Sequence, residues 1–555
     1  MASKIARAKA KKAKAPAGAR AAGKKSAAKK SRAKKPAKAA AQKTDVRHGT
    51  SASKLIPPPG GAAVRMYRIG HGDCFLIAFA GEKPDKPVHV LIDCGYKPKS
   101  PEMLAEPTDV AKIGQDILDT TGGFVDVAIV THEHQDHVNG FRPDNFPDLK
   151  VGEVWFAWTE NPKDKVANKL RRKFHDRLLR LVDTRASLMG LGNAAAAEDV
   201  DWYLEFELGE PSDQYNGLPG GAAAAAGGAK DPSRSANKVA MKFLRDCAPG
   251  EPKYLYPHEK VRAVPGAKSA RAFVLGPPRD IEKIDDLDPE GDEEFGQGFG
   301  MAQGAAAATT AATATTTSPF QTRHAIPLAE AFADPRYADF YKTYYGNADA
   351  PDAGDDKEVI SAASWRRLTA DDAADACALA LAMNNATNNA SLALAFELSM
   401  SGKVLLFIGD AQAGNWRSWS DGEFDDDGTK VTATDLLERT VLYKVGHHGS
   451  HNATLNGKAG SGHPCLAEMA KGENAAEFVA MITAVEKWAH QKPKPNWNHP
   501  LPAIKAALVE KAGGRVLQTD SKLPESPSSS GAANWPSFVD SVRETSLYFD
   551  LMIGL

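Results

Sequence analysis

Cysteine is scarce in this sequence. The 555 residues include only five, an odd number, and no two of them form a C-x-x-C pair. They are Cys74, Cys94, Cys247, Cys377 and Cys465. A disulfide framework or a cysteine-based zinc site is therefore not expected, and a reducing compartment fits this usage. A metal site in this chain has to be built from histidine and carboxylate side chains.

Long apolar runs are also missing. No uninterrupted apolar stretch approaches the roughly 20 residues that a membrane-spanning helix needs. No apolar segment with a small-residue cleavage site follows the amino terminus, so no secretory signal is expected. We therefore expect a cytoplasmic protein that does not enter the membrane. A composition of 42% hydrophobic and 8% aromatic residues is typical of a globular chain.

Acidic residues are absent before Asp45. Residues 1–43 hold 16 of the 69 Lys and Arg, which leaves 53 basic residues against 70 acidic ones in the rest of the chain. Residues 1–60 are rich in Lys and Ala and have little to bury, so we expect a disordered tail. Such a tail favours contact with nucleic acid through phosphate groups. The alternative is a solubilising or self-tethering segment on an acidic body.

Beyond the tail, strand-like and helix-like segments alternate. Apolar runs bounded by Gly or Pro predict strands at residues 64–81, 87–96 and 123–130, the first two as a hairpin. The apolar spacing of residues 108–120 and 164–190 predicts helices. This alternation is typical of an α/β fold.

Polar clusters follow three of the predicted strands. "THEHQDHVNG" (131–140) comes directly after one strand, Asp410 follows "KVLLFIG", and His447 and His448 follow "TVLYKVG". Residues just past the carboxyl ends of strands meet at one edge of an α/β sheet. Imidazole suits zinc, and a carboxylate bridges two ions or favours manganese. These clusters therefore predict a metal site.

The spacing within "THEHQDH" assigns the side chains to two ions. His132 and His134 point the same way if the loop is extended, so they can share one ion. Asp136 and His137, one turn further on, can face a second ion, and Asp410 has two oxygens with which to hold both. Two ions roughly 3.5–4 Å apart can hold a bridging hydroxide and clamp a phosphoryl transition state.

Seven motifs carry a resemblance to a known family. They are "THEHQDH", "IGHGDCFLI", "LIDCG", "NNASLALAFE", "FIGDA", "KVGHHGS" and "NHP" with "GGRVLQTD". The first resembles the HxHxDH signature of the metallo-β-lactamase superfamily. The others occur in the order seen in the soluble domain of competence DNA-uptake channel proteins. The resemblance covers about residues 64–158, a piece near 273–278, and residues 388–555.

The resemblance implies a fold and a division of the chain. The implied fold is an αββα sandwich with long insertions. Residues 61–278 and 384–555 would form its two halves, and residues 279–383 would be an insertion of partly low complexity. The segment "LPGGAAAAAGGAKDPS" (218–233) is expected to be a linker.

The resemblance also implies a role for each site residue. The implied metal ligands are His132, His134, Asp136, His137, Asp410 and His448, with His448 preferred over His447 as the ligand. The implied catalytic residues are Asp136, His447 and His71. Residues expected to orient the ligands or contact the substrate are Asp93, Asp73 and His499. Many superfamily members have another histidine before the bridging aspartate, where this chain has the Asn-rich "NNATNNAS" (384–391); the number of metal ions therefore stays open.

The expected activity is phosphodiester or nucleic-acid hydrolysis with two divalent ions, zinc or alternatively manganese. A metal-bound hydroxide would attack phosphorus while a histidine assists the leaving oxygen. Two alternatives stay open. The same fold could hydrolyse a lactone, thioester or lactam, because a fold does not fix a substrate. The chain could instead be a non-catalytic module that binds nucleic acid through its tail.

Overall fold

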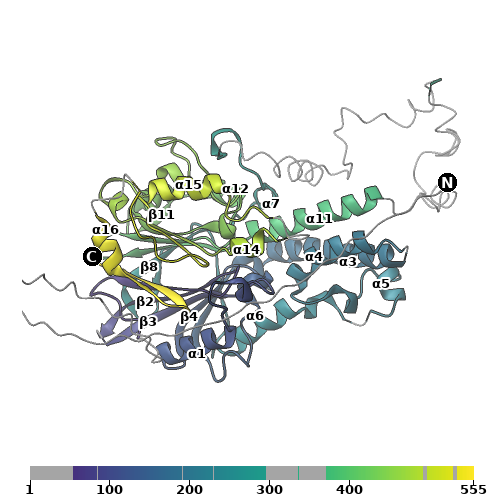
Figure 1. The fold of residues 1–555 in the computed structure, drawn as a ribbon, viewed down its shortest axis with the longest axis horizontal. Coiled ribbons are helices and arrows are strands. Elements are labelled where there is room, and N and C mark those ends of the chain that lie inside the picture. The colour runs from purple at the N-terminus through teal and green to yellow at the C-terminus, as the bar shows by residue number, and fades with distance from the viewer. Residues whose placement is uncertain are drawn as a thin grey trace, which may run out of the picture. The chain divides into compact units, whose positions relative to one another are not determined.

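Two large mixed sheets form the centre of the protein, which we describe from a computed structural model (Figure 1). The described residues are 54–83, 85–190, 192–228, 230–295, 335–336, 370–491, 497–528 and 534–555. Most of the predicted tail and much of the predicted insertion (296–334 and 337–369) lie outside them. Among the described helices, none has the length and apolar content needed to cross a bilayer.

The first sheet has eight strands and combines both ends of the described chain. In spatial order they are β16 (Val542–Glu544), β17 (Tyr548–Ile553), β1 (Ala62–Tyr67), β2 (Cys74–Lys83), β3 (Lys86–Cys94), β4 (Phe124–Val130), β5 (Lys150–Ala157) and β6 (Lys253–Leu255). Strands β3 to β6 are parallel, whereas β1 is antiparallel to both β2 and β17. The stretch predicted as one strand at 64–81 is therefore two, because the glycine-rich turn "GHGD" separates β1 from β2.

The second sheet has seven strands and is drawn from the later part of the chain. In spatial order they are β15 (Val516–Gln518), β14 (Val479–Ile482), β13 (Thr440–Lys444), β10 (Val404–Phe407), β9 (Ala393–Leu398), β8 (Ala267–Gly276) and β7 (Arg262–Val264). Strands β10, β13, β14 and β15 are parallel. A small hairpin, β11 (Phe424–Asp426) and β12 (Thr429–Val431), stands apart from both sheets.

One apolar core joins the two sheets. Phe75 and Ile92 of the first sheet and Phe396 and Leu405 of the second belong to the same cluster of buried side chains. Helices close the outer faces. The first sheet is covered by α1 (Val110–Thr121) and α6 (Ala236–Asp246), and the second by α12 (Ala413–Ser418), α13 (Ala433–Glu438) and α15 (Pro502–Lys511).

A group of helices lies beside the sheets (Figure 1). It comprises α3 (Lys165–Gly190), α4 (Ala194–Leu208), α5 (Ala222–Ala225) and α11 (Ala370–Asn389). Leu181, Leu204 and Met383 share their apolar cluster. Part of the stretch predicted as a linker is thus the helical turn α5, whose Ala223 amide donates to Asp183 of α3. The boundary predicted between residues 383 and 384 falls inside α11.

A buried ion cluster ties the first strand of the described chain to the last. Arg65 of β1 has no exposed surface and makes two bonds to Asp550 of β17, Nε–Oδ1 at 2.7 Å and Nη2–Oδ2 at 2.9 Å. Its Nη1 donates to Asp116 of α1 at 2.7 Å, and its guanidinium lies 3.6 Å from the ring centroid of Tyr548. A bidentate arginine satisfied this fully is a strong polar contact.

His89 of β3 makes stability depend on pH. Its side chain is buried, its Nε2 has no hydrogen-bond partner, and burial, aided by the charge of Arg65, lowers its pKa to about 4. Because the folded pKa lies below the ordinary value of about 6.5, the unfolded chain takes up a proton first as the pH falls. The contribution of the neutral His89 to the free energy of unfolding is therefore complete above pH 6.5. It is lost as the pH falls from 6.5 to about 4.

We expect His89→Leu to remove about 3 kcal/mol of that pH-dependent loss. Urea unfolding at pH 7.5 and pH 4.5 measures it, as the difference between wild type and variant at each pH. If the two proteins lose the same free energy of unfolding between these pH values, His89 does not account for the dependence.

Candidate metal centre

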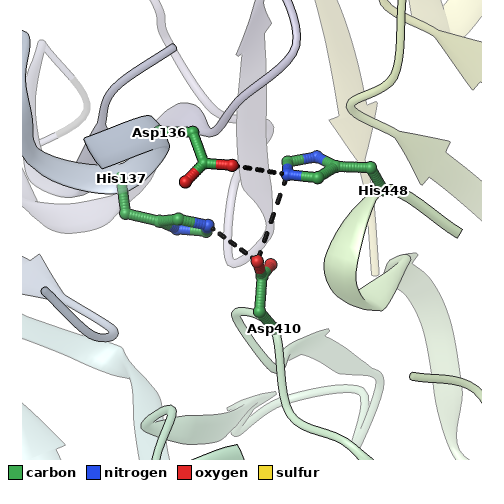
Figure 2. A group of neighbouring side chains, drawn as sticks. All are labelled: Asp136, His137, Asp410 and His448. Carbon is green, nitrogen blue, oxygen red and sulfur yellow. Dashed lines mark hydrogen bonds and ion pairs between the residues drawn. The ribbon is translucent and has the colours of Figure 1, made fainter. Parts of the chain in front are cut away.

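Four polar side chains converge at the ends of parallel strands from both sheets (Figure 2). Asp136 and His137 lie on the short helix α2 (Gln135–Val138) after β4; Asp410 follows β10; and His448 follows β13. His137 Nε2 is 3.1 Å from Asp410 Oδ2, and His448 Nε2 is 3.0 Å from Asp136 Oδ2 and 4.0 Å from Asp410 Oδ2. One atom from each side chain lies within 4.8 Å of the others, which makes the cluster a candidate metal site.

A second cluster of donors also lies beside Asp410, and its His132 ring is 4.1 Å from the His137 ring. His132 Nε2 is 3.0 Å from His134 Nδ1, and Asn388 Oδ1 is 3.1 Å from the first and 2.7 Å from the second. His132 Nε2 is also 3.9 Å from Asp410 Oδ2. We call His132, His134 and Asn388 the first group, and Asp136, His137 and His448 the second group. Asp410 lies between the two groups.

Asn388 is the donor that the sequence reasoning did not name. It lies on α11 within the Asn-rich stretch, where the resemblance predicts a further histidine before the bridging aspartate. An amide oxygen is a ligand for harder ions such as manganese and calcium, and is less common on zinc. The signal was present in "NNATNNAS", but the sequence alone did not say which of four asparagines faces the site.

Each histidine of the two groups has its other ring nitrogen held by the protein. His137 Nδ1 is 2.8 Å from Asp93 Oδ2, and His448 Nδ1 is 2.9 Å from the Thr483 carbonyl oxygen. His134 Nε2 is 3.0 Å from Glu207 Oε1 of α4, and His132 Nδ1 is 3.2 Å from Ser391 Oγ. Such contacts fix the tautomer and leave the opposite nitrogen directed at the centre, as in metal-bound histidines.

Asp93, at the end of β3, positions residues 131–137, which carry the candidate ligands after β4 and which we call the ligand loop. Its Oδ1 accepts from the Thr131 amide at 2.8 Å, and its Oδ2 accepts from the Thr131 hydroxyl at 2.7 Å. Its backbone has φ 54°, a left-handed conformation that most residues avoid. Asp73 lies nearby, 3.7 Å from His137 Nδ1, and accepts from Thr483 Oγ1 at 2.6 Å. Both predicted aspartates thus contact groups that hold the ligands.

His447 and His448 point to different places because their backbone turns sharply. Their φ values of 40° and 55° are left-handed. His448 is fully buried, whereas the His447 side chain is 13% exposed and its Nε2 lies 3.9 Å from Asp410 Oδ2. Burial lowers the pKa of His447 to about 3. A neutral His447 imidazole therefore faces the centre at its more open side.

His71 and His499 lie behind His448. The His71 ring is 4.3 Å from the His448 ring and stacks on the His499 ring at 5.6 Å. His71 has no exposed surface, and its Nδ1 accepts a bond from the Val485 amide at 3.1 Å. Glu133, in the ligand loop, pairs with Lys238 of α6.

The centre carries more buried negative than positive charge. Its four carboxylates are buried, as are two lysines. They are Asp73, Asp93, Asp136 and Asp410, with Lys97 and Lys444. Burial opposes the ionisation of Asp136, but the Lys97 ammonium beside it holds its pKa well below the usual range. The two lysines do not balance the four carboxylates, so the centre keeps an excess of acidic groups that favours the binding of cations.

Compared with models of known protein families and with curated proteins, the chain matches none.

The donor atoms fit divalent ions. Among the described residues, Asp136 Oδ1 is buried and has no hydrogen-bond partner, and the buried His137 Nε2 and Asp410 Oδ2 have only each other, at 3.1 Å. Burial disfavours a charge on His137, but Asp410, Asp73 and Asp93 raise its pKa well above the ordinary value. The carboxylates therefore favour a positive charge at the position of the His137 ring. Buried polar atoms without partners are rare in native proteins and call for an explanation such as an ion. Histidine nitrogen with carboxylate oxygen is a donor set for zinc or manganese.

A cavity of about 450 Å³ lies between the ligand loop and the neighbouring helices. His132 and Glu207, which contact the centre, also line it. Its basic lining comes from Arg171 and Arg172 of α3 and from Lys238. The helices beside the sheets therefore shape the surroundings of the centre in addition to supplying Asn388 and Glu207.

Asn388→Ala is expected to weaken the binding of one divalent ion by about 10- to 100-fold, because the first group then keeps only its two histidines beside Asp410. Asn388→Asp restores an oxygen donor and adds charge, so it should bind at least as tightly as wild type. Zinc titration after chelation measures both. Asn385→Ala is the matched control, since the Asn385 oxygen accepts from Gln412 instead. Unchanged affinity in Asn388→Ala would remove Asn388 from the ligand set.

Proposed function

We propose that this chain is a metal-dependent hydrolase of the metallo-β-lactamase superfamily and that it cleaves phosphodiesters. Two mixed sheets with a common core and helices on their outer faces support the αββα sandwich of that superfamily. Residues 61–278 and 384–555 would be its two halves. Helix α11 begins in the segment between them and ends in the second half, where its Asn388 reaches the site.

The observation that carries the proposal is the position of Asp410 between two donor groups. Asp410 Oδ2 lies 3.1 Å from His137 Nε2 in the second group and 3.9 Å from His132 Nε2 in the first group. A carboxylate oxygen in that place suits the bridge of a two-metal site. The first group would hold one ion and the second group the other, with zinc or alternatively manganese bound.

When bound, two such ions supply charge neutralisation at the phosphoryl oxygens and an activated water at neutral pH. The chain's own residues do the rest. Asp93 holds the ligand loop and His137 in place, and Glu207 fixes His134. His447 is neutral at pH 7, so its imidazole can accept a hydrogen bond at the open side of the centre. The His71 ring, 4.3 Å from the His448 ring, would hold that ring in position.

The test is metal content together with activity. Wild type and Asp136→Ala/His137→Ala are purified, bound metal is counted, and cleavage of bis(p-nitrophenyl) phosphate and single-stranded DNA is assayed. We expect about two ions per wild-type chain, and loss of both metal and cleavage in the double variant. Asp540→Ala/His463→Ala, which changes two exposed residues of the same types, is the control and should match wild type.

Other outcomes would redirect the proposal. Metal without cleavage of either substrate would favour a lactone, thioester or lactam. No metal after supply of zinc and manganese would favour the non-catalytic module, with nucleic acid bound by the basic residues at 1–43. In that case removal of the tail, and not His132→Ala, should abolish nucleic-acid binding, because phosphate contacts would supply the affinity.

A further inference from the structure

Lys97 places an ammonium group at the second group. It follows β3 in the segment "CGYKPK", and its side chain is 4% exposed. Nζ lies 2.9 Å from Asp136 Oδ2 on one side. On the other side it lies 3.3 Å from the ring centroid of Phe206 and 5.8 Å from that of Trp497. The aromatic faces hold the ammonium by cation–π attraction and fix it close to the centre.

The second buried lysine of the centre shows what a structural role requires. Lys444 Nζ contacts three oxygens: Asp73 Oδ2, the Gly409 carbonyl at 2.8 Å and Asp410 Oδ1 at 3.5 Å. An ammonium group has three donors. Lys444 therefore has an oxygen for each of its donors. Lys97 has one oxygen and a ring face, so it keeps donor capacity that an additional oxygen can use.

Charge gives the kind of oxygen that suits this place. Without ions, Lys97 balances the carboxylate of Asp136. With divalent ions in the two groups, Asp136 and Asp410 are already neutralised, and the charge of Lys97 becomes surplus in a site with little water. A buried surplus cation is costly unless an anion meets it. A neutral ester or lactone cannot supply that anion, whereas a phosphate group does.

We infer that Lys97 is a substrate-binding residue that holds an anionic oxygen of the phosphoryl group, and that it selects phosphate esters over neutral esters. The inference rests on the proposed function, since it names the substrate class of the same site. The contact would lie beside Asp136, at the edge of the site formed by Phe206 of α4. Lys97 and α4 thus set the substrate class, while the ligand loop holds the ions.

Lys97→Met, Lys97→Arg and the control Lys112→Met, which removes an exposed lysine of α1, test the inference. Five quantities are measured on metal-loaded protein: bound metal, affinity for inorganic phosphate by calorimetry, kcat and KM for bis(p-nitrophenyl) phosphate, and kcat/KM for p-nitrophenyl acetate. Charge-assisted bonds of this kind change affinity by about 10- to 100-fold. We expect Lys97→Met to weaken phosphate binding and raise KM for the phosphodiester by that factor, with metal content and ester hydrolysis unchanged. Lys97→Arg should keep most of the phosphate affinity.

Three results would overturn the inference: unchanged phosphate affinity in Lys97→Met, an equal fall in the hydrolysis of both substrates, or loss of bound metal, which would make Lys97 a support for the ions. Failure of the proposed function looks different. In that case wild type leaves the phosphodiester intact, and calorimetry alone decides whether Lys97 binds phosphate.

Discussion

Asp410→Asn is expected to reduce phosphodiester cleavage by about 10³-fold, equal to about 4 kcal/mol of transition-state stabilisation. Asparagine keeps the shape of the side chain but loses the charge that would balance two ions. It also removes the carboxylate that contacts the Lys444 ammonium. The ammonium would then face a bound metal ion with no negative charge between them. Steady-state kinetics with bis(p-nitrophenyl) phosphate measures the rate, and metal analysis should show less than one ion per chain.

The control for this variant is Asp421→Asn, which makes the same change in an exposed ion pair with Lys283. Its rate and metal content should equal those of wild type, because exposed pairs contribute little. Circular dichroism of Asp410→Asn establishes that the fold is intact. Full activity in a folded Asp410→Asn protein would mean that the reaction does not use a bridging carboxylate.

Arg65→Met is expected to lower the free energy of unfolding by about 3–5 kcal/mol, because it leaves a buried charge uncompensated. Asp550 is 2% exposed and Asp116 is 11% exposed on their side chains, and both lose their bonds to the guanidinium. The methionine stem preserves most of the packing against Tyr548. Urea unfolding followed by tryptophan fluorescence measures the difference.

A second variant separates charge from packing at Arg65. In Arg65→Met/Asp550→Asn the stranded carboxylate is neutralised, so we expect part of the lost stability to return. Arg180→Met, at an exposed position of α3, should change the free energy of unfolding by less than about 0.5 kcal/mol. If Arg65→Met is no less stable than Arg180→Met, the ion cluster does not stabilise the fold.

The sequence was most informative where neighbours in the chain are also neighbours in space. The strand ending at Val130 and the ligand loop after it depend on local patterns of apolar and polar residues, and so do the strands before Asp410 and His447. Parallel strands bring such ends to one edge, which is why these groups of residues meet. The sharp difference in direction between His447 and His448 also arises locally, from their left-handed backbone.

The remaining parts of the centre are set by packing between distant segments, which a single sequence does not reveal. Asn388 reaches His132 across 256 residues, and Glu207 reaches His134 across 73. Lys97 looks like any loop lysine until Phe206 of α4 is placed over it. Helix α4 was not predicted because alanine, charged and aromatic residues alternate there without a clear apolar stripe, and packing against α3 decides its place.

The pairing of β1 with β17 has a consequence for synthesis of the chain. Arg65 and Asp550 are separated by 485 positions. At a translation rate of about 5–20 residues per second, roughly 25–100 s pass between the emergence of β1 and that of its partner. During that time β1 presents an open edge to any other strand in the cell. Ribosome-associated chaperones that shield nascent strands are therefore expected to matter more for this protein than for one whose first strand gains both of its neighbours early.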